Sequence, residues 1–336
     1  NPVTGEDVRQ ALFSTDVQYN RNIHAAYTLV KGKHKKLGYQ VGLRAEYTAR
    51  EIAATNISGA IQEVDRIDFF PSAHFSYKIN ESQELLLSYS RRINRPRSYY
   101  FEPFLTWESQ YSVYRGNPNL NPEYINSIES SWIKRFGKNG SLSVDVYGKL
   151  LEGMIQRSPA VYDTNIVLSS PNNVGNSTSI GVDPTFIYFI KDWWNTNFGV
   201  SLYYYKVKSS LDTRNANRES FNWNINWINT FTIKNNWRIQ LVSKYRSKTV
   251  TALGENEENY GFDASIRKSI MKNKLAFTFQ ATDFLSTRRN NYSSTINNLS
   301  INRMSDPVSP LFMLTVSLKL NNYKKVMGRQ QELDDF

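Results

Sequence analysis

Three histidines, His24, His34 and His74, are the side chains of this chain best suited to acid–base chemistry or metal binding. They stand in different segments, and none has a partner at the short spacings that zinc sites usually show. The chain has no cysteine, which excludes thiolate metal sites, cysteine nucleophiles and a disulfide framework. No glycine-rich phosphate loop and no recognisable Ser-His-Asp arrangement occur. We therefore predict no catalytic site, no cofactor and no metal. The remaining catalytic hypothesis is an enzyme that uses His24 or His74, since the alternation of residues described below places both on the inward-facing side of the predicted barrel.

Aromatic side chains gather in one long polar connection, where their rings could stack on a sugar or another flat apolar ligand. These candidate ligand-binding residues are Tyr99, Tyr100, Phe101, Phe104, Trp107, Tyr111 and Tyr114. Anchoring at a membrane interface explains such rings equally well, and the cluster Tyr99 to Phe101, together with Trp193, Trp194 and Trp237, resembles the aromatic girdles of outer-membrane barrels.

The segments that position these residues are extended, because apolar and polar residues alternate along almost the whole chain. From Leu37 to Ala49 every odd position is apolar, and the even positions carry Gly, Gln, Arg, Glu and Thr. A period of two is typical of a strand with two different faces. We predict about thirteen strands, which begin near Ile23, Leu37, Asp68, Glu84, Tyr124, Ser141, Ser177, Asn195, Ser220, Trp237, Tyr260, Lys274 and Leu311.

The connections between these strands alternate strictly between short and long. The short turns are at 31–36, 80–82, 137–140, 191–192, 234–236 and 271–273, and the long, irregular connections run near 50–67, 92–123, 156–176, 208–218, 247–259 and 283–310. Outer-membrane barrels show this asymmetry, with tight periplasmic turns and long extracellular loops. The fold class we predict is therefore all-β, an antiparallel up-and-down transmembrane β-barrel.

Composition removes several other classes of protein. No stretch approaches the roughly 18 to 20 apolar residues that a membrane-spanning helix needs. The net charge of +11 comes from scattered basic residues and short turns, which gives no reason to expect nucleic-acid binding. A soluble β-sandwich remains open, because it produces the same alternation strand by strand.

Parity places several charged or polar side chains on the inner, wet face of the predicted barrel. These candidates are Arg44, Glu46, His74, Arg92 and Arg238. Solvated wall residues without a particular partner are one interpretation of these side chains.

Several segments resemble the outer-membrane β-barrel branch of TonB-dependent receptors. They are Gly42 to Thr48, Phe70-Pro71-Ser72, Ser88 to Pro96 and, most specifically, Gly116-Asn117-Pro118-Asn119-Leu120-Asn121-Pro122-Glu123. The resemblance implies a barrel of twenty-two strands around an N-terminal plug, energised through TonB, of which this chain would hold roughly the last thirteen strands. In a complete receptor of this kind, we expect the inward-facing candidates named above to face the plug. It also implies the Gram-negative outer membrane, contacts with lipid and lipopolysaccharide, and a possible surface lipoprotein partner.

An odd strand count indicates part of a larger barrel, because closed bacterial barrels normally have an even number. A fourteenth strand in residues 1–20, where Ala11, Phe13, Thr15, Val17 and Tyr19 alternate, would instead allow closure. We assign residues 1–320 to the barrel and 321–336 to a polar periplasmic tail. The functions to be distinguished are active uptake of an unidentified nutrient, a passive pore, and a soluble glycan-binding sandwich.

Overall fold

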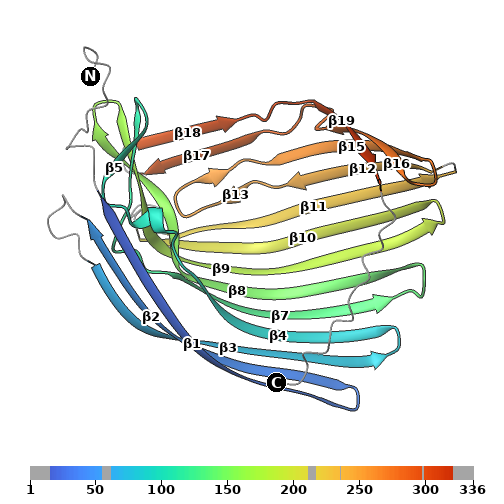
Figure 1. Ribbon diagram of the computed structural model, residues 1–336, viewed down its shortest axis with the longest axis horizontal. Coiled ribbons are helices and arrows are strands. Elements are labelled where there is room, and N and C mark those ends of the chain that lie inside the picture. Colours follow the sequence, from blue (N-terminus) through green and yellow to red (C-terminus); the bar gives the residue numbers. More distant parts are fainter. Residues whose placement is uncertain (1–15, 55–61, 211–216, 235, 297–298, 321–336) are drawn as a thin grey trace.

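One large antiparallel sheet dominates the computed structural model, which describes residues 16–54, 62–210, 217–234, 236–296 and 299–320 (Figure 1). Thirteen strands follow one another around the sheet in chain order. They are β1 (Val17–His34), β2 (Leu37–Ala54), β3 (Gln62–Asn80), β4 (Gln83–Asn94), β7 (Glu123–Arg135), β8 (Gly140–Asp163), β9 (Ile166–Lys191), β10 (Trp194–Ser209), β11 (Asn217–Ile233), β12 (Trp237–Arg246), β15 (Asn259–Ile270), β16 (Leu275–Thr282) and β19 (Leu311–Leu318). The predicted number and sequence of wall strands are confirmed.

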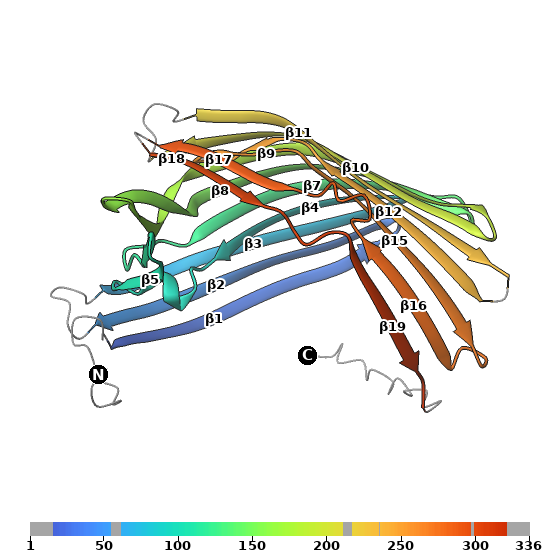
Figure 2. The same ribbon diagram turned by 90° about the horizontal axis from the view of Figure 1, so that it is seen from above.

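The sheet curves through an arc, as Figure 2 shows, and its first and last strands, β1 and β19, are not paired with each other. The described strands thus form an open wall of barrel type rather than a closed fourteen-strand ring. Of the proposed extra strand, Val17 and Tyr19 belong to β1, while Ala11, Phe13 and Thr15 lie outside the described residues. The proposed tail at 321–336 also lies outside them.

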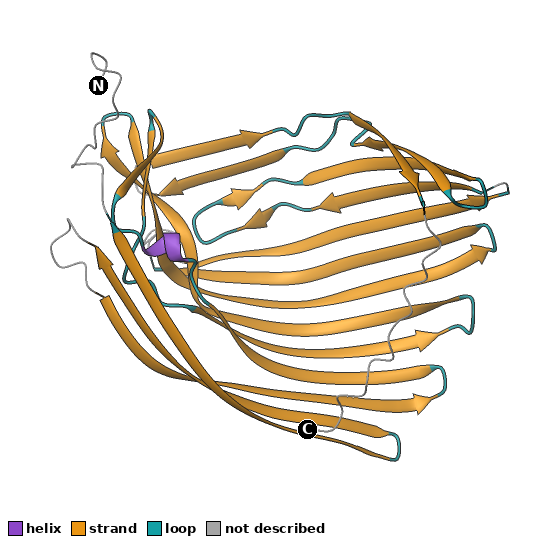
Figure 3. Cartoon of the chain, in the orientation of Figure 1, coloured by secondary structure: helices purple, strands orange, loops and turns teal. Residues whose placement is uncertain are grey.

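The remaining elements all belong to the long connections. The β4–β7 connection contains a short 3-10 helix η2 (Ser98–Phe101) and the strands β5 (Leu105–Ser109) and β6 (Ser112–Arg115). A four-stranded sheet, ordered β13-β14-β17-β18, is built from β13 (Thr249–Val250), β14 (Glu255–Asn256), β17 (Asn290–Ile296) and β18 (Leu299–Ser305). Figure 3 shows how little of the described chain is helical. None of the helical structure in the described ranges is long and apolar enough to cross a membrane.

All six predicted short turns connect neighbouring wall strands at one end of the sheet (Figure 1). The long connections differ from the prediction, because much of their length is strand. Region 156–176, predicted to be irregular, consists of β8 and β9 continuing to a turn at Thr164 and Asn165. Its residues show no alternation because β6 and the β13–β14 turn pack against this part of the hairpin, so that residues 166–175 are all buried or half-buried.

Register assigns one face of the wall to apolar side chains. Val41 lies opposite Ala73, Ala73 opposite Tyr89, and the row continues to Ile128. These outer-face side chains remain accessible: Ile67 is 62% and Phe221 64% exposed. No second sheet covers this outer face within the described part of the chain, which removes the β-sandwich alternative. Apolar exposure on this scale is what a lipid-facing surface requires.

The opposite face, called the inner face below, carries the polar set. One row runs from Gln40 through His74 and Ser88 to Glu129 and Tyr147. These five residues border a hollow of about 750 Å³. The wall therefore separates a wet inner side from an apolar outer side.

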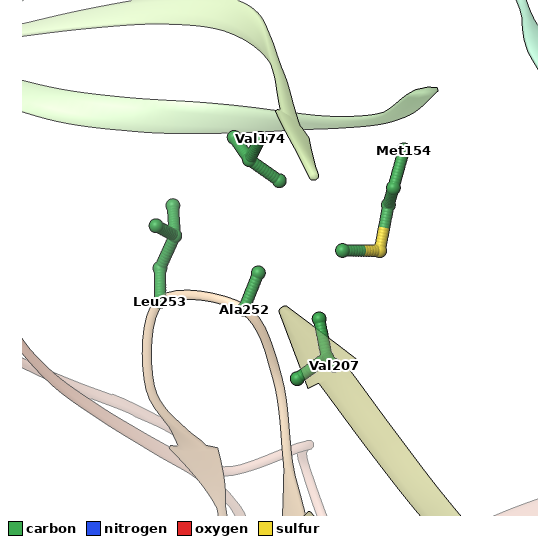
Figure 4. Close-up of a cluster of buried hydrophobic side chains, with 5 residues drawn as sticks. All are labelled: Met154, Val174, Val207, Ala252 and Leu253. Carbon is green, nitrogen blue, oxygen red and sulfur yellow. The ribbon is translucent and has the colours of Figure 1, made fainter. Parts of the chain in front are cut away.

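The register of the tall strands β8 and β9 shifts around Gly153 (φ +68), which has no partner in the ladder, and Gly175 (φ +137), which lies opposite Met154. A Cβ atom on Gly175 would lie 1.8 Å from the carbonyl oxygen of Lys208, so only glycine fits there. The β13–β14 turn packs against β8, β9 and β10 through a buried apolar cluster (Figure 4). This cluster consists of Met154, Val174, Val207, Ala252 and Leu253.

Part of the predicted aromatic girdle is present at the end with the short turns. Trp193, Trp194 and Phe231 form mutual ring contacts there, and Lys268 lies 4.8 Å from the ring centroid of Trp237. The prediction was wrong for Tyr99, Tyr100 and Phe101, which belong to a loop that turns away from the outer face, as described next.

Candidate ligand-binding cleft

Residues 95–122, the connection between β4 and β7, fold onto the inner face of the wall and are called the inner loop here. Phe101 of this loop is 1% exposed and forms a buried cluster with Leu120 and with Ile52 of β2. Arg50 places its guanidinium carbon 4.2 Å from the Phe101 ring centroid. It also donates hydrogen bonds to the carbonyl oxygens of Leu120 (3.2 Å) and Pro118 (3.3 Å). These contacts fix the loop against β2.

The Gly116 to Glu123 motif forms the return of the inner loop to the wall. A Cβ atom on Gly116 would lie 2.5 Å from the Glu102 carbonyl oxygen, so the backbone at Gly116 approaches the backbone at Glu102 as closely as glycine allows. The backbone N–H of Asn121 donates to the side chain of Asn173 on β9 (2.9 Å). At the end of the motif, the Glu123 carboxylate accepts the N–H of Ile155 (2.6 Å). As predicted, this motif makes a rigid re-entry into the strand.

The inner loop and the tall hairpin together form one side of a cleft at the end of the sheet that carries the long connections. Ser112 of β6 lies opposite Val167 of β9 in a short parallel ladder, which ties the loop to the hairpin. The far side is formed by β12 and by the β13-β14-β17-β18 sheet. The enclosed space measures about 780 Å³, the size of pocket that small-molecule ligands occupy.

Three arginines face this cleft. Arg157 of β8 is held in place, because it donates to Glu108 (3.0 Å) and lies 4.5 Å from the Tyr114 ring centroid. Arg246 of β12 and Arg303 of β18 form no ion pair with any carboxylate among the described residues. Asparagine and tyrosine side chains surround them, namely Asn256, Asn290, Asn291, Tyr111 and Tyr292. The cleft therefore offers two uncompensated guanidinium groups in a polar and aromatic lining, which suits an anionic ligand.

The structure distributes the predicted aromatic ligand residues over different environments. Tyr111, 60% exposed, lines the cleft, whereas Trp107 packs edge-on against Tyr162 outside its lining. Phe101 and Tyr114 are buried in the inner loop and pack against the protein itself, and their role as ligand contacts stays a prediction. Burial raises the pKa of the Tyr114 phenol, which donates to the Tyr99 carbonyl oxygen as a neutral group (3.4 Å).

The other predicted rings, Tyr99, Tyr100 and Phe104, are half-buried in the same loop, and Tyr99 and Tyr100 meet edge to face at 4.6 Å. They are not among the residues that line the cleft. Most of the aromatic cluster thus packs the loop itself.

The predicted inward-facing residues share the inner face by register but do not form one site. Glu46 binds both Arg44 (2.6 Å) and Arg95 of the inner loop (2.5 Å). His74 lies between Gln40 and Ser88 in the hollow of the inner wall. Arg92, opposite Ile125, and Arg238, opposite Thr232 and Arg267, lie elsewhere on the inner face.

His24 faces the other way, and the inward direction expected for it was wrong. The two-residue turn after β1 pairs His34 with Leu37, so even positions of β1 share the outer face with odd positions of β2. His24 accordingly stacks on Tyr47, with 6.4 Å between the ring centroids. The described residues contain no group of three or more metal-ligating side chains.

The sequence reasoning missed all three cleft arginines. Arg246 continues the inner parity of Arg238 and Lys244 on the same strand, so alternation was a usable signal. Arg157 and Arg303 gave no such signal, because both lie in regions that read as irregular connections.

Comparisons with known proteins agree with this architecture. The family model described as "Outer membrane protein beta-barrel family" matches residues 1–318. No curated protein matches the chain. Three similar solved structures are the ferric-catecholate import receptor Fiu from K12 E. coli (TM-score 0.61, 12% identity), the siderophore receptor PirA from Pseudomonas aeruginosa (0.56, 11%) and the ferric yersiniabactin uptake receptor FyuA from Yersinia pestis (0.57, 8%).

The similarity covers 90%, 81% and 87% of this chain but only 45%, 55% and 45% of those receptors, respectively. The chain thus spans about half the length of the receptors it resembles.

Proposed function

The chain belongs to the outer membrane protein beta-barrel family, and from this membership we propose that it forms part of the barrel wall of a TonB-dependent receptor that actively takes up a nutrient across the Gram-negative outer membrane. In such a receptor the short turns face the periplasm and the long connections face the outside. The cleft then lies on the extracellular side, where an arriving ligand is first met. A plug domain, TonB, lipopolysaccharide and a surface lipoprotein are the partners that go with this proposal.

The observation that carries the proposal is the cleft between the inner loop and the β13-β14-β17-β18 sheet. A binding role is supported by its size, by its location on the inner side of the wall and by the guanidinium groups of Arg246 and Arg303, which have no carboxylate partner in the described part of the chain. We propose that the ligand is an anion that also presents a flat face to Tyr111 and Tyr292. Fiu, PirA and FyuA, whose folds are similar, are import or uptake receptors, which is consistent with this assignment.

The test separates active uptake from the passive-pore alternative. In the first experiment, the full-length protein is reconstituted in planar lipid bilayers, and we expect no steady ion conductance. In the second, the gene is deleted in cells with and without TonB, and we expect the growth that depends on the gene to be lost equally when TonB is removed. Steady conductance together with TonB-independent growth would establish the passive pore instead.

A further inference from the structure

The inner wall beneath the inner loop carries a second concentration of positive charge, separate from the cleft. Arg21 of β1 lies directly opposite Arg50 of β2, and Arg66 of β3 lies opposite Thr48, one inner-face position away. The inner loop adds Arg95 and Arg97. Arg21 and Arg95 line one cavity together with Arg50 and Arg66, and they line a neighbouring one together with Arg97. Five guanidinium groups from four segments therefore lie in two adjoining cavities. Like charges directly opposite each other on a sheet are destabilising unless something compensates them.

Three of these five arginines have partners within the protein. Arg66 binds Asp68 (2.9 Å), and Arg95 binds Glu46 (2.5 Å). Arg50 is held by the carbonyl groups of the inner loop and by the Phe101 ring. Two carboxylates therefore face five guanidinium groups, and Glu46 is already shared with Arg44.

Arg21 and Arg97 are the two that remain uncompensated. Among the described residues, neither forms an ion pair with a carboxylate; Arg21 only approaches the Tyr19 ring, at 5.8 Å. Both line a pocket of about 490 Å³ between β1 and the start of the inner loop, together with Arg95 and Tyr19.

Arg21 and Arg97 both face this pocket without a carboxylate partner among the described residues. An oxyanion bound in the pocket would compensate both guanidinium groups at the same time.

We propose that this pocket is a binding site for an oxyanion, the phosphate, sulfate or carboxylate group of a small-molecule ligand. Guanidinium groups bind such oxyanions through two parallel hydrogen bonds. The pocket and the cleft have no lining residue in common: residues 95–98 of the inner loop line the pocket, and Glu108, Tyr111 and Ser112 line the cleft. If the proposed uptake function holds, the pocket gives the anionic ligand a second binding position on the inner wall, next to β1.

The test uses the full-length protein in detergent, with inorganic pyrophosphate as the probe in a calorimetric titration at low salt. The titration is made in an Arg246→Ala/Arg303→Ala background, so that the cleft does not contribute. We expect pyrophosphate binding to persist there, to weaken at least tenfold when Arg21→Ala and Arg97→Ala are added, and to remain unchanged when Arg267→Ala is added instead. Arg267 is an exposed arginine of the inner face on β15, distant in the sheet order from β1.

Unchanged folding of each variant is checked by its heat-dependent migration in detergent gels. The proposed oxyanion site would be refuted if pyrophosphate did not bind in the Arg246→Ala/Arg303→Ala background. It would also be refuted if adding Arg21→Ala and Arg97→Ala left the binding unaltered. An acidic segment of the full-length protein that occupied the pocket would give the first of these results. None of these outcomes depends on TonB or on conductance, so the proposed uptake function can fail while the pocket stands, and the reverse also holds.

Discussion

Arg50 on the barrel wall and Phe101 in the inner loop form a cation–π pair, with the guanidinium carbon 4.2 Å from the ring centroid. The pair joins the wall to a loop that also contacts it through the Ile52, Phe101 and Leu120 cluster and through the Arg95–Glu46 ion pair. Because the guanidinium also binds two loop carbonyl groups, one residue anchors the loop by charge, by packing and by hydrogen bonds. The loop in turn forms a side of both the cleft and the arginine pocket.

Replacing Phe101 by alanine should release the inner loop from the wall. Truncating a fully buried phenylalanine typically costs about 3 to 5 kcal/mol, and here most of that cost falls on the closed loop rather than on the strand ladders. We expect rapid protease cleavage within residues 95–122 while the barrel stays folded. Trp107→Ala is the control, because that side chain is half-exposed; equal cleavage of both variants would contradict the anchoring role of Phe101.

Gly116→Ala should disrupt the re-entry motif. The added methyl would lie 2.5 Å from the Glu102 carbonyl oxygen and 2.7 Å from that of Tyr100, and backbone atoms cannot rotate away. Overpacking of this kind costs about 1 to 3 kcal/mol. The measurement is thermal denaturation in detergent, with Gly148→Ala as the matched variant, since its nearest new contact would be an ordinary 3.5 Å. Similar melting temperatures for the two variants would argue against the tight approach.

Acid should loosen the connection that follows β16. Asp283 is 1% exposed, and burial raises the pKa of its carboxyl, but hydrogen bonds from Arg288 and Thr287 outweigh burial and hold that pKa below its ordinary value. A depressed pKa gives stability that is present above the unfolded value of about 4 and lost as pH falls through the folded value.

Deuterium exchange of the Thr287 and Arg288 amides, corrected for the intrinsic effect of pH, tests this expectation. Protection should be constant above about pH 4 and fall below it. In Asp283→Asn the protection should already be weaker at neutral pH, by about 1 to 3 kcal/mol, and should no longer respond to acid. A wild-type profile that stays flat to low pH would show that the carboxylate does not hold this turn.

Removing the free cleft arginines should impair ligand capture. Charged hydrogen bonds contribute about 1.5 to 3 kcal/mol each, so Arg246→Ala/Arg303→Ala should raise the half-saturating nutrient concentration for gene-dependent growth by about tenfold or more. Arg267→Ala serves as the control on the same face. A growth curve indistinguishable from that of the control would exclude these arginines from ligand binding.

Alternation was sufficient to predict the wall, because whether a strand residue faces one side or the other is a local property. Leu37 to Ala49 shows its apolar and polar faces without reference to any other segment, and the short turns fix which strands are neighbours. The face of His24 was nevertheless predicted wrongly, because it depends on how the turn pairs β1 with β2.

The site depended on contacts between residues far apart in the chain. The far ends of β8 and β9 are covered by β6 and by the β13–β14 turn, so their residues follow no period of two and were predicted to be a loop. The residues around Phe101 in the sequence do not predict that Arg50 will stack on its ring. Those around Arg21 do not predict that Arg97 will line the same pocket. The sequence determined a membrane wall with two faces, because the alternation of apolar and polar residues within each strand shows which face meets lipid and which meets water. Only the tertiary structure decided where the inner loop rests and which arginines are left without a counter-charge, because those outcomes depend on distances between separate strands.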